Sequence, residues 1–164
     1  MTLPNPFKLP RGRIICMIPS RKPTRIPHYD YATPNYYFVT ICCNKKHCIF
    51  GTVDQPNINC EIAKVCMESI PQIFPSIVVD KYVVMPNHVH AILVLQDNRV
   101  DLTTVVGQYK TAVTRRIRSL TPNLLVWQRS FHDHIIRDQK RYELIWSYID
   151  TNQYRWKDDK FYVD

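Results

Sequence analysis

The run Lys81-Tyr-Val-Val-Met-Pro-Asn-His-Val-His-Ala-Ile-Leu-Val-Leu95 says more about the architecture of this chain than any other segment. Two apolar segments, each long enough for a strand, flank Pro86-Asn87, a dipeptide that favours a tight turn. The run therefore predicts an antiparallel hairpin with strands over residues 76–85 and 88–96. Pro86 is also compatible with a bulge inside one long strand, because proline within a sheet is confined to such positions.

The remaining elements surround this hairpin in an order typical of a mixed fold. Apolar periodicity and boundary residues predict strands over 36–43 and 131–137, and helices over 60–70, 101–119 and 140–152. The resulting order, β-α-β-β-α-β-α, is that of a ferredoxin-like antiparallel sheet with helices on one face, extended by a C-terminal helix. The sequence thus predicts an α+β fold.

The helices over 60–70 and 101–119 have recognisable boundaries and buried faces. Asn59 and Asp101 are the expected N-caps, and Pro71 is expected to end the first of the two helices. The first helix is predicted to bury Ile62, Val65, Cys66 and Ile70, and the second to bury Leu102, Val105, Val106, Tyr109, Val113 and Ile117.

A net charge of +8 favours a polyanionic partner. Residues 1–28 contain no acidic residue and half of the 12 prolines, so we expect a basic, proline-rich arm ahead of one domain over 29–164. Such an arm either lies along a nucleic-acid backbone or is a solvated tail. The candidate DNA-binding residues are Arg11, Arg13, Arg21, Lys22 and Arg25 in the arm, and Lys110, Arg115 and Arg118 on one helix. The alternative for the three helix residues is an ordinary solvated helix face.

Composition excludes several functional classes. No apolar run approaches the ~18 residues of a membrane span, and the N-terminus does not resemble a secretory signal, so we expect an intracellular protein without membrane association. The six cysteines are then expected to be reduced and buried, with a zinc site as the alternative. Only three glycines are present, which excludes a P-loop or a dinucleotide-binding fingerprint.

Two histidines, His88 and His90, are predicted to project from one face of a buried strand, because side chains alternate along strands. Neutral imidazoles at this spacing hold two coordination positions of one divalent ion and leave others open. The alternative is a pair of hydrogen-bonded sheet histidines. Ile92 stands where a histidine-triad hydrolase has a third histidine, and no glutamate between the pair and Glu143 supports a cupin-type site.

The surroundings of the pair resemble a known family. The segment Tyr82–His90 is similar to the HUH motif (histidine, bulky hydrophobic residue, histidine) of single-tyrosine transposases, which include insertion-sequence transposases and the REP-associated tyrosine transposases. The likeness spans residues 26–157 and keeps the family's order. Its further signatures are Tyr29-Asp-Tyr, Tyr37-Phe-Val-Thr-Ile, Phe50-Gly51, Trp127-Gln128, His134-Ile-Ile-Arg137 and Tyr148-Ile149 with Asn152.

The resemblance implies attack by a tyrosine hydroxyl on single-stranded DNA, which leaves a 5′-phosphotyrosine link and a free 3′-hydroxyl. It also implies a Mg²⁺ or Mn²⁺ ion on His88 and His90, a DNA hairpin or imperfect palindrome as substrate, and a prokaryotic protein of the cytoplasm and nucleoid. Such families include homodimers that exchange their tyrosine helices as well as monomers, so a homodimer and a monomer are both compatible with the resemblance.

Tyr148 is the predicted nucleophile among the ten tyrosines. At ~100° per residue, Tyr148 and Asn152 share the apolar arc of the last helix with Leu144, Ile145 and Ile149, where a polar side chain needs a partner. The resemblance points to the same two positions, as nucleophile and third metal ligand. The structural alternatives are a locally bonded tyrosine and an asparagine C-cap. Other candidates for the third ligand are Gln153 and His134.

The leading hypothesis is therefore a metal-dependent single-strand endonuclease and strand transferase, that is, a transposase. A domesticated protein that binds DNA hairpins without cleaving them would keep the same fold. A metal-dependent phosphoesterase would use water as the nucleophile and would tolerate loss of the tyrosine hydroxyl.

Overall fold

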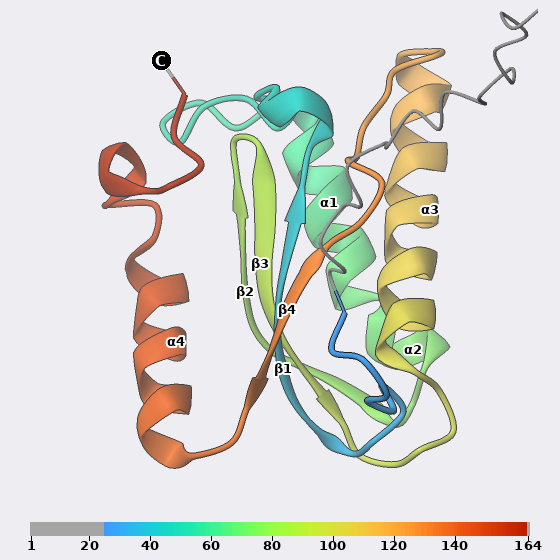
Figure 1. Cartoon of the computed structure of the whole chain (residues 1–164). Helices are drawn as coiled ribbons and strands as arrows, with labels where there is room; N and C mark the ends of the chain where they lie inside the picture. The colour runs from blue at the N-terminus through green and yellow to red at the C-terminus, as the bar shows by residue number, and fades with distance from the viewer. Residues whose placement is uncertain (1–24, 164) are drawn as a thin grey trace, which may run out of the picture.

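The computed structural model describes residues 25–163. The candidate residues Arg11, Arg13, Arg21 and Lys22, with most of the expected arm, lie outside this range. The elements in chain order are β1 (Asn35–Cys42), η1 (Asn44–Lys46), α1 (Ile58–Glu68), α2 (Ile70–Ile73), β2 (Ile77–Met85), β3 (His88–Leu95), α3 (Leu102–Leu120), β4 (His132–Ile136), α4 (Gln139–Thr151) and η2 (Trp156–Asp158), where η marks a short 3-10 helix (Figure 1).

The strands form one antiparallel sheet in the order β2-β3-β1-β4. Together with the element order, this arrangement confirms the predicted ferredoxin-like α+β fold. Pro86 and Asn87 form the turn between β2 and β3, so the hairpin is confirmed. The irregularity in its register lies between Val79 and Lys81 rather than at Pro86.

Helices cover both faces of the sheet (Figure 1). On one face, α1 and α3 pack against each other over a core that includes Tyr37 and Val39 of β1. All six residues of the predicted α3 stripe are buried there. On the opposite face α4 lies alone and packs on β2 and β3, with Ile145 and Ile149 against Ile92. This C-terminal helix was the predicted addition to the fold.

The start and the buried face of α1 differ from the prediction. Asn57, and not Asn59, is the N-cap, because its side-chain oxygen accepts hydrogen bonds from two backbone N–H groups of the first turn. Pro71 lies in the first turn of the short helix α2, a position that tolerates proline. Of the four residues predicted to be buried, Cys66 and Ile70 are buried, Ile62 is half-buried and Val65 is exposed. A neighbouring arc of α1 faces the core, so Cys60, Ala63 and Met67 are buried as well.

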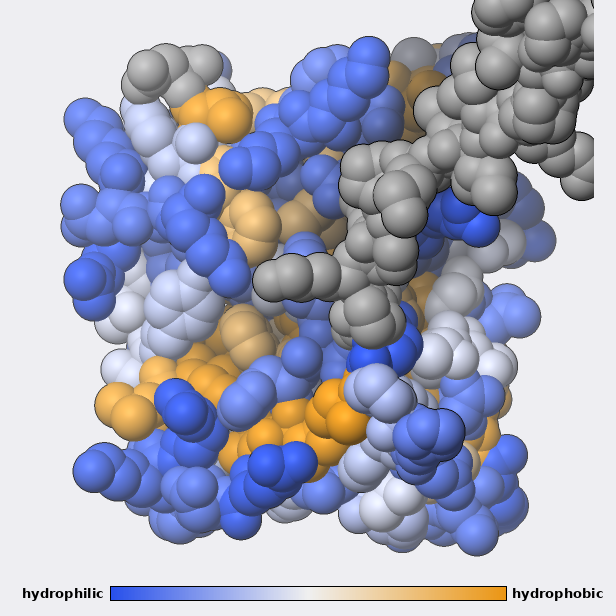
Figure 2. Space-filling view, viewed as in Figure 1, coloured by the Kyte–Doolittle hydropathy of each residue, from blue (hydrophilic) through white to orange (hydrophobic). Residues whose placement is uncertain are grey.

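Because α4 packs on β2 and β3, part of the sheet face over β1 and β4 is uncovered. Tyr36 on the inner strand β1 is 43% exposed, and His134 on the edge strand β4 is exposed as well. Figure 2 shows apolar residues in the lower centre of this face, surrounded by hydrophilic ones. The open part of the sheet lies on the same face as α4.

Within residues 25–163, no helix combines the length and the apolar character that crossing a membrane requires. The cysteines in this range are free, and all but Cys48 are buried, as predicted. None of them belongs to a group of side chains in the described range that could hold a metal ion. Cys16 lies outside the described residues.

Candidate active site

His88 and His90 lie at the end of β3 that follows the hairpin turn, and they are 0% and 1% exposed. Alternate residues of a strand project in parallel, and the two Nε2 atoms are 3.0 Å apart. Both imidazoles thus present one ring nitrogen to the same point on the α4 side of the sheet.

Each ring is held by a hydrogen bond at its other nitrogen. Asn87 Oδ1 can only accept, so it places the proton of His88 on Nδ1, 2.8 Å away, and leaves the Nε2 lone pair available. The Asn87 amide is oriented in turn by donating to the carbonyl oxygen of Phe161. Thr40 Oγ1 lies 2.8 Å from His90 Nδ1 and can accept in the same way. Such outer partners orient histidines that bind metals.

Burial lowers the pKa of both imidazoles. The pKa of His88 falls to about 4, because desolvation penalises the charged ring more than the nearby Asp159 carboxylate stabilises it. Desolvation and the neighbouring His88 lower the pKa of His90 well below its ordinary value. Both rings are therefore neutral at pH 7, which is the protonation state that a metal ligand requires.

The spacing of these nitrogen atoms fits a divalent ion. Two ligands that bind one ion at about 2.1 Å and at a right angle lie about 3.0 Å apart, which matches the Nε2–Nε2 distance. Asp159 completes a group of three side chains whose ligand atoms lie within 4.8 Å of one another. Among the described residues, Asn152 Oδ1 is the one buried side-chain polar atom without a partner, and Nδ2 of the same amide donates to Asp159 at 2.9 Å.

Tyr148 reaches this pair from α4. Its hydroxyl lies 3.2 Å from His90 Nε2, although 58 residues separate the two positions. The tyrosine ring contacts Phe38 and His90, with ring centroids 6.2 and 5.2 Å apart, and these contacts fix its orientation. Tyr148 is 37% exposed and lines a cavity of about 110 Å³ together with Asn152 and Asp159.

Asp159 belongs to the same cluster, and the sequence did not reveal it. Its Oδ2 accepts hydrogen bonds from the Tyr148 hydroxyl at 2.8 Å and from Asn152 Nδ2 at 2.9 Å. Its Oδ1 accepts from the backbone N–H of Phe161 at 2.7 Å. The only sequence signal was an acidic pair, Asp158-Asp159, in a charged tail, and such pairs are usually solvated.

The charges of the cluster set the protonation of the tyrosine. Burial opposes ionisation of Asp159, but hydrogen bonds from Phe161, Asn152 and Tyr148 outweigh it and lower the pKa of the carboxyl. Burial and the charged carboxylate raise the pKa of the Tyr148 hydroxyl above its ordinary value. The hydroxyl is therefore protonated at neutral pH and needs a cation or a proton acceptor before it can act as a nucleophile.

The three candidates for the third ligand lie at different places. Asn152 is the C-cap of α4 and is 1% exposed, and its Nδ2 also joins it to the cluster by donating to Asp159. Gln153 is exposed and lines a separate cavity together with Lys64. His134 is exposed on β4 and lies outside the group formed by the histidine pair and Asp159.

The DNA-binding candidates within the described residues differ in their surroundings. Arg115 and Arg118 are exposed on α3 and line a cavity of about 450 Å³. Lys110 Nζ donates to backbone carbonyl oxygens of the loop before β4, the nearest at 2.7 Å. Arg25 forms an ion pair with Asp133 at 2.6 Å. Arg118 also has a partner within the fold, because its Nε donates to the carbonyl oxygen of Leu124 at 3.0 Å. Lys110 lines the same cavity as Arg115 and Arg118.

Replacing Asp159 by asparagine is expected to lower the affinity for Mn²⁺ roughly 10-fold or more, because a charged ligand becomes a neutral amide. Isothermal titration calorimetry measures the change. Asp158→Asn alters the exposed neighbouring carboxylate and should bind Mn²⁺ like the wild type. Unchanged affinity in Asp159→Asn would show that the carboxylate restrains the Tyr148 hydroxyl without binding metal.

The chain is similar to known proteins in sequence and in fold. The chain is 36% identical over 169 residues to an uncharacterized protein of Haemophilus influenzae, and the match covers 88% of this chain and 94% of that protein. A solved structure of a REP-associated tyrosine transposase bound to a REP hairpin is similar, with a TM-score of 0.60 and 22% identity. That match covers 80% of this chain and 72% of the other, and it shows a shared fold.

The family model described as "Transposase IS200 like" matches residues 31–152, well over half of the chain. The matched range contains His88, His90 and Tyr148 and ends before Asp159. The region that matches the family model therefore includes both the histidine pair on an inner strand and the tyrosine on the last helix. The chain belongs to the IS200-like transposase family.

Proposed function

We propose that this transposase cuts and rejoins single-stranded DNA, with Tyr148 as the nucleophile and a divalent ion held beside it by His88 and His90. The observation that carries the proposal is the 3.2 Å distance between the Tyr148 hydroxyl and His90 Nε2. Family membership supports a transposase. Because Tyr148 meets the histidines of its own chain, one chain carries all three side chains of the proposed site.

In the proposed step, the Tyr148 oxygen bonds to phosphorus while the bond from phosphorus to the 3′ oxygen of the preceding nucleotide breaks. Tyr148 loses its hydroxyl proton and the leaving 3′ oxygen gains one, so the products are a 5′-phosphotyrosine ester and a 3′-hydroxyl. The ester conserves the phosphodiester, so the 3′-hydroxyl of another strand can attack it, restore Tyr148 and join the two strands.

The side chains around Tyr148 have separate tasks in this proposal. Asp159 Oδ2 accepts the hydroxyl hydrogen at 2.8 Å and is the nearest acceptor for the departing proton. His88 and His90 stay neutral and buried, with their Nε2 atoms directed at one point. Phe38 stacks on His90 and contacts Tyr148 edge to face, which holds the nucleophile in position.

His88, His90 and Asp159 would hold the divalent ion, with Asn152 Oδ1 as a further oxygen ligand. When bound, the ion supplies positive charge that stabilises the charge developing on the phosphate oxygens. A mixed set of imidazole and oxygen ligands suits Mn²⁺ better than Mg²⁺, which prefers oxygen ligands alone. We therefore propose Mn²⁺ as the preferred ion.

A DNA hairpin is the proposed substrate. The similar REP-associated transposase is bound to a REP hairpin, and the positive net charge favours a polyanion. Arg115, Arg118 and Arg129 line the cavity of about 450 Å³ beside α3. The loop that carries Arg129 is hydrogen-bonded to Cys42, the cross-strand partner of His88, so this cavity and the proposed site share one end of the sheet.

Arg115→Gln is expected to weaken hairpin binding for all sequences alike and to reduce the slope of log K against log salt by roughly 1, because one phosphate contact is lost. Fluorescence anisotropy over a series of NaCl concentrations measures the slope. Arg99→Gln is the matched control, since Arg99 is exposed and pairs with Asp97 instead. A slope in Arg115→Gln equal to that of the wild type would remove this cavity from the DNA interface.

The proposed chemistry is tested with hairpins that carry randomised single-stranded flanks and a label at either end, incubated with protein and Mn²⁺. On a denaturing gel, the 3′ label should migrate with the protein and the 5′-labelled fragment should be released. An adduct that carries the 5′ label would contradict the proposed polarity. Cleavage without an adduct would indicate water as the nucleophile, and binding without cleavage would indicate a DNA-binding protein that no longer cuts.

A further inference from the structure

A second cavity lies on the same sheet face as the histidine pair, at the opposite end of β1. Its volume is about 450 Å³, which is within the range of small-ligand sites. The ends of β1 and β4 and the first turn of α4 line it. The cavity is open to solvent, because α4 packs mainly on β2 and β3 and covers this part of β1 and β4 incompletely.

Tyr36 is the unusual residue of this cavity. β1 pairs with strands on both sides, yet the Tyr36 side chain is 43% exposed. Tyr142 of α4 contacts it edge to face, with ring centroids 5.7 Å apart. The Tyr142 hydroxyl donates to Asp80 at 2.9 Å, which anchors this supporting ring. Tyr36 therefore presents a fixed and accessible aromatic surface.

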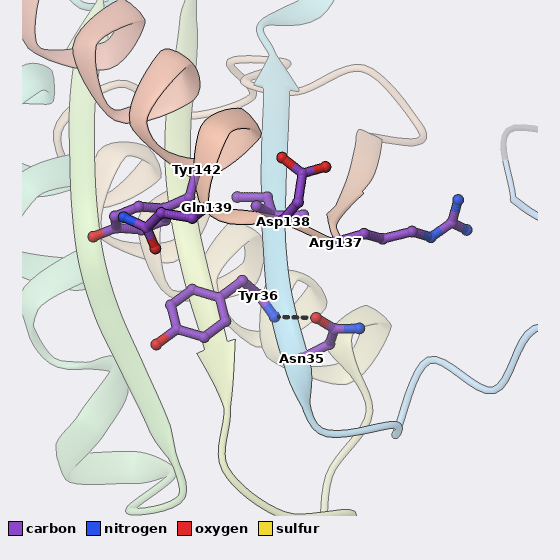
Figure 3. Close-up of a pocket in the computed structure, with 7 residues that line it drawn as sticks. Asn35, Tyr36, Arg137, Asp138, Gln139 and Tyr142 are labelled. Atoms are coloured by element: carbon purple, nitrogen blue, oxygen red, sulfur yellow. Dashed lines mark hydrogen bonds between the residues drawn. The ribbon is translucent and has the colours of Figure 1, made fainter.

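Polar groups surround the two rings. Figure 3 shows Gln139 beside Tyr142, Asn35 next to Tyr36, and Arg137 extending away from the rings. Asn35 uses its side-chain oxygen to accept from the Tyr36 backbone N–H, and Gln139 uses its side-chain nitrogen to donate to a carboxylate of α4. Within residues 25–163, each of these two amides keeps one polar atom without a partner.

An aromatic path connects this cavity with the proposed catalytic site. Phe38 is the next residue of β1 on the same face, and it stacks on His90 at 5.2 Å. Tyr36 precedes Thr40, the cross-strand partner of His90, by four residues, which is about 13 Å along a strand. A DNA strand whose scissile phosphodiester lies at Tyr148 thus needs only a few nucleotides, laid along β1, to reach Tyr36.

We propose that an unpaired base of the substrate strand stacks on Tyr36, with its edge toward Asn35 and Gln139 and its phosphate toward Arg137. Aromatic side chains with adjacent amides and cations are the usual means of binding unpaired bases. This inference rests on the proposed function, since the base belongs to the same DNA strand that Tyr148 attacks. It adds a nucleotide site outside the cluster that carries out the chemistry.

The test is a double-mutant cycle between protein and DNA, measured by fluorescence anisotropy. The probe is a DNA hairpin with a single-stranded extension in which an abasic site is moved one position at a time. Tyr36→Ala should weaken binding of the intact probe roughly 5- to 150-fold. One abasic position should weaken binding to the wild type by a similar factor and should have no further effect on Tyr36→Ala.

Two variants separate lost stacking from misfolding. Tyr36→Phe keeps the ring and should bind like the wild type, whereas Ile73→Ala removes an exposed apolar side chain on α2 and should also bind normally. Wild-type affinity in Tyr36→Ala, or losses that simply add at every abasic position, would overturn the proposal. Binding and cleavage are measured separately, so a protein that shows the cycle but forms no adduct would support the base site and contradict the nuclease.

Discussion

Replacement of Tyr148 by phenylalanine is expected to abolish the covalent protein–DNA adduct and to slow strand cleavage roughly 10⁴-fold or more, as loss of a nucleophile does. The variant removes only the hydroxyl, so the ring still packs against Phe38 and His90. Asp159 keeps hydrogen bonds from Asn152 Nδ2 and from a backbone N–H. We therefore expect a loss of folding stability of only about 1 kcal/mol.

A denaturing gel with 3′-labelled hairpin DNA measures the adduct, and fluorescence anisotropy shows whether Tyr148→Phe still binds the hairpin. The matched control is Tyr154→Phe, because Tyr154 follows α4 closely and is almost fully exposed. It should form the adduct at the wild-type rate. If Tyr154→Phe lost the adduct and Tyr148→Phe kept it, the nucleophile would be Tyr154 and the assignment to Tyr148 would be wrong.

Replacement of His90 by alanine is expected to lower the affinity for Mn²⁺ roughly 100-fold or more and to stop cleavage. Loss of a residue that hydrogen-bonds a metal ligand typically lowers metal affinity roughly 10- to 100-fold, and loss of the ligand itself should lower it further. His90 Nε2 lies 3.0 Å from His88 Nε2 and 3.2 Å from the Tyr148 hydroxyl, so one substitution removes both contacts. His88→Ala should have a similar effect on affinity. Isothermal titration calorimetry on protein stripped with EDTA measures it.

Two further variants make this prediction specific. Thr40→Val keeps the shape of the side chain and removes the group 2.8 Å from His90 Nδ1, so we expect a smaller loss of affinity, roughly 10-fold. His134→Ala removes an exposed histidine and should leave the affinity unchanged. A large loss in His134→Ala would instead make it the third ligand. Circular dichroism melts check that His90→Ala, which opens a cavity, is still folded.

Elements with strong local signals were predicted closely. The turn residues Pro86-Asn87 between two apolar runs and the cap Asp101 ahead of a regular stripe each place their element without help from distant residues. The start of α1 was less certain, because Asn57 and Asn59 are both good capping residues. Both side-chain nitrogens donate to the carbonyl oxygen of Ile49, so this contact does not distinguish them. The side-chain oxygen of Asn57, which accepts from two backbone N–H groups of the first turn, shows where the helix begins.

The candidate site was predictable in part. The alternation of strand residues placed His88 and His90 together, and helical periodicity put Tyr148 and Asn152 on one arc of α4. Asp159 could not be found in this way. It reaches the cluster because the chain turns back after α4, and a backbone N–H and two side chains then stabilise its carboxylate.

Local pattern alone established the hairpin, the α+β element order and the shared face of the histidine pair, because periodicity and turn chemistry act over a few residues. Tertiary packing decided where α4 lies. Its contact with β2 and β3 brings Tyr148 to 3.2 Å from His90 and leaves Tyr36 43% exposed. The periodicity of apolar residues along the sequence predicts neither the position of Tyr148 nor the exposure of Tyr36, because both depend on which part of the sheet the last helix covers.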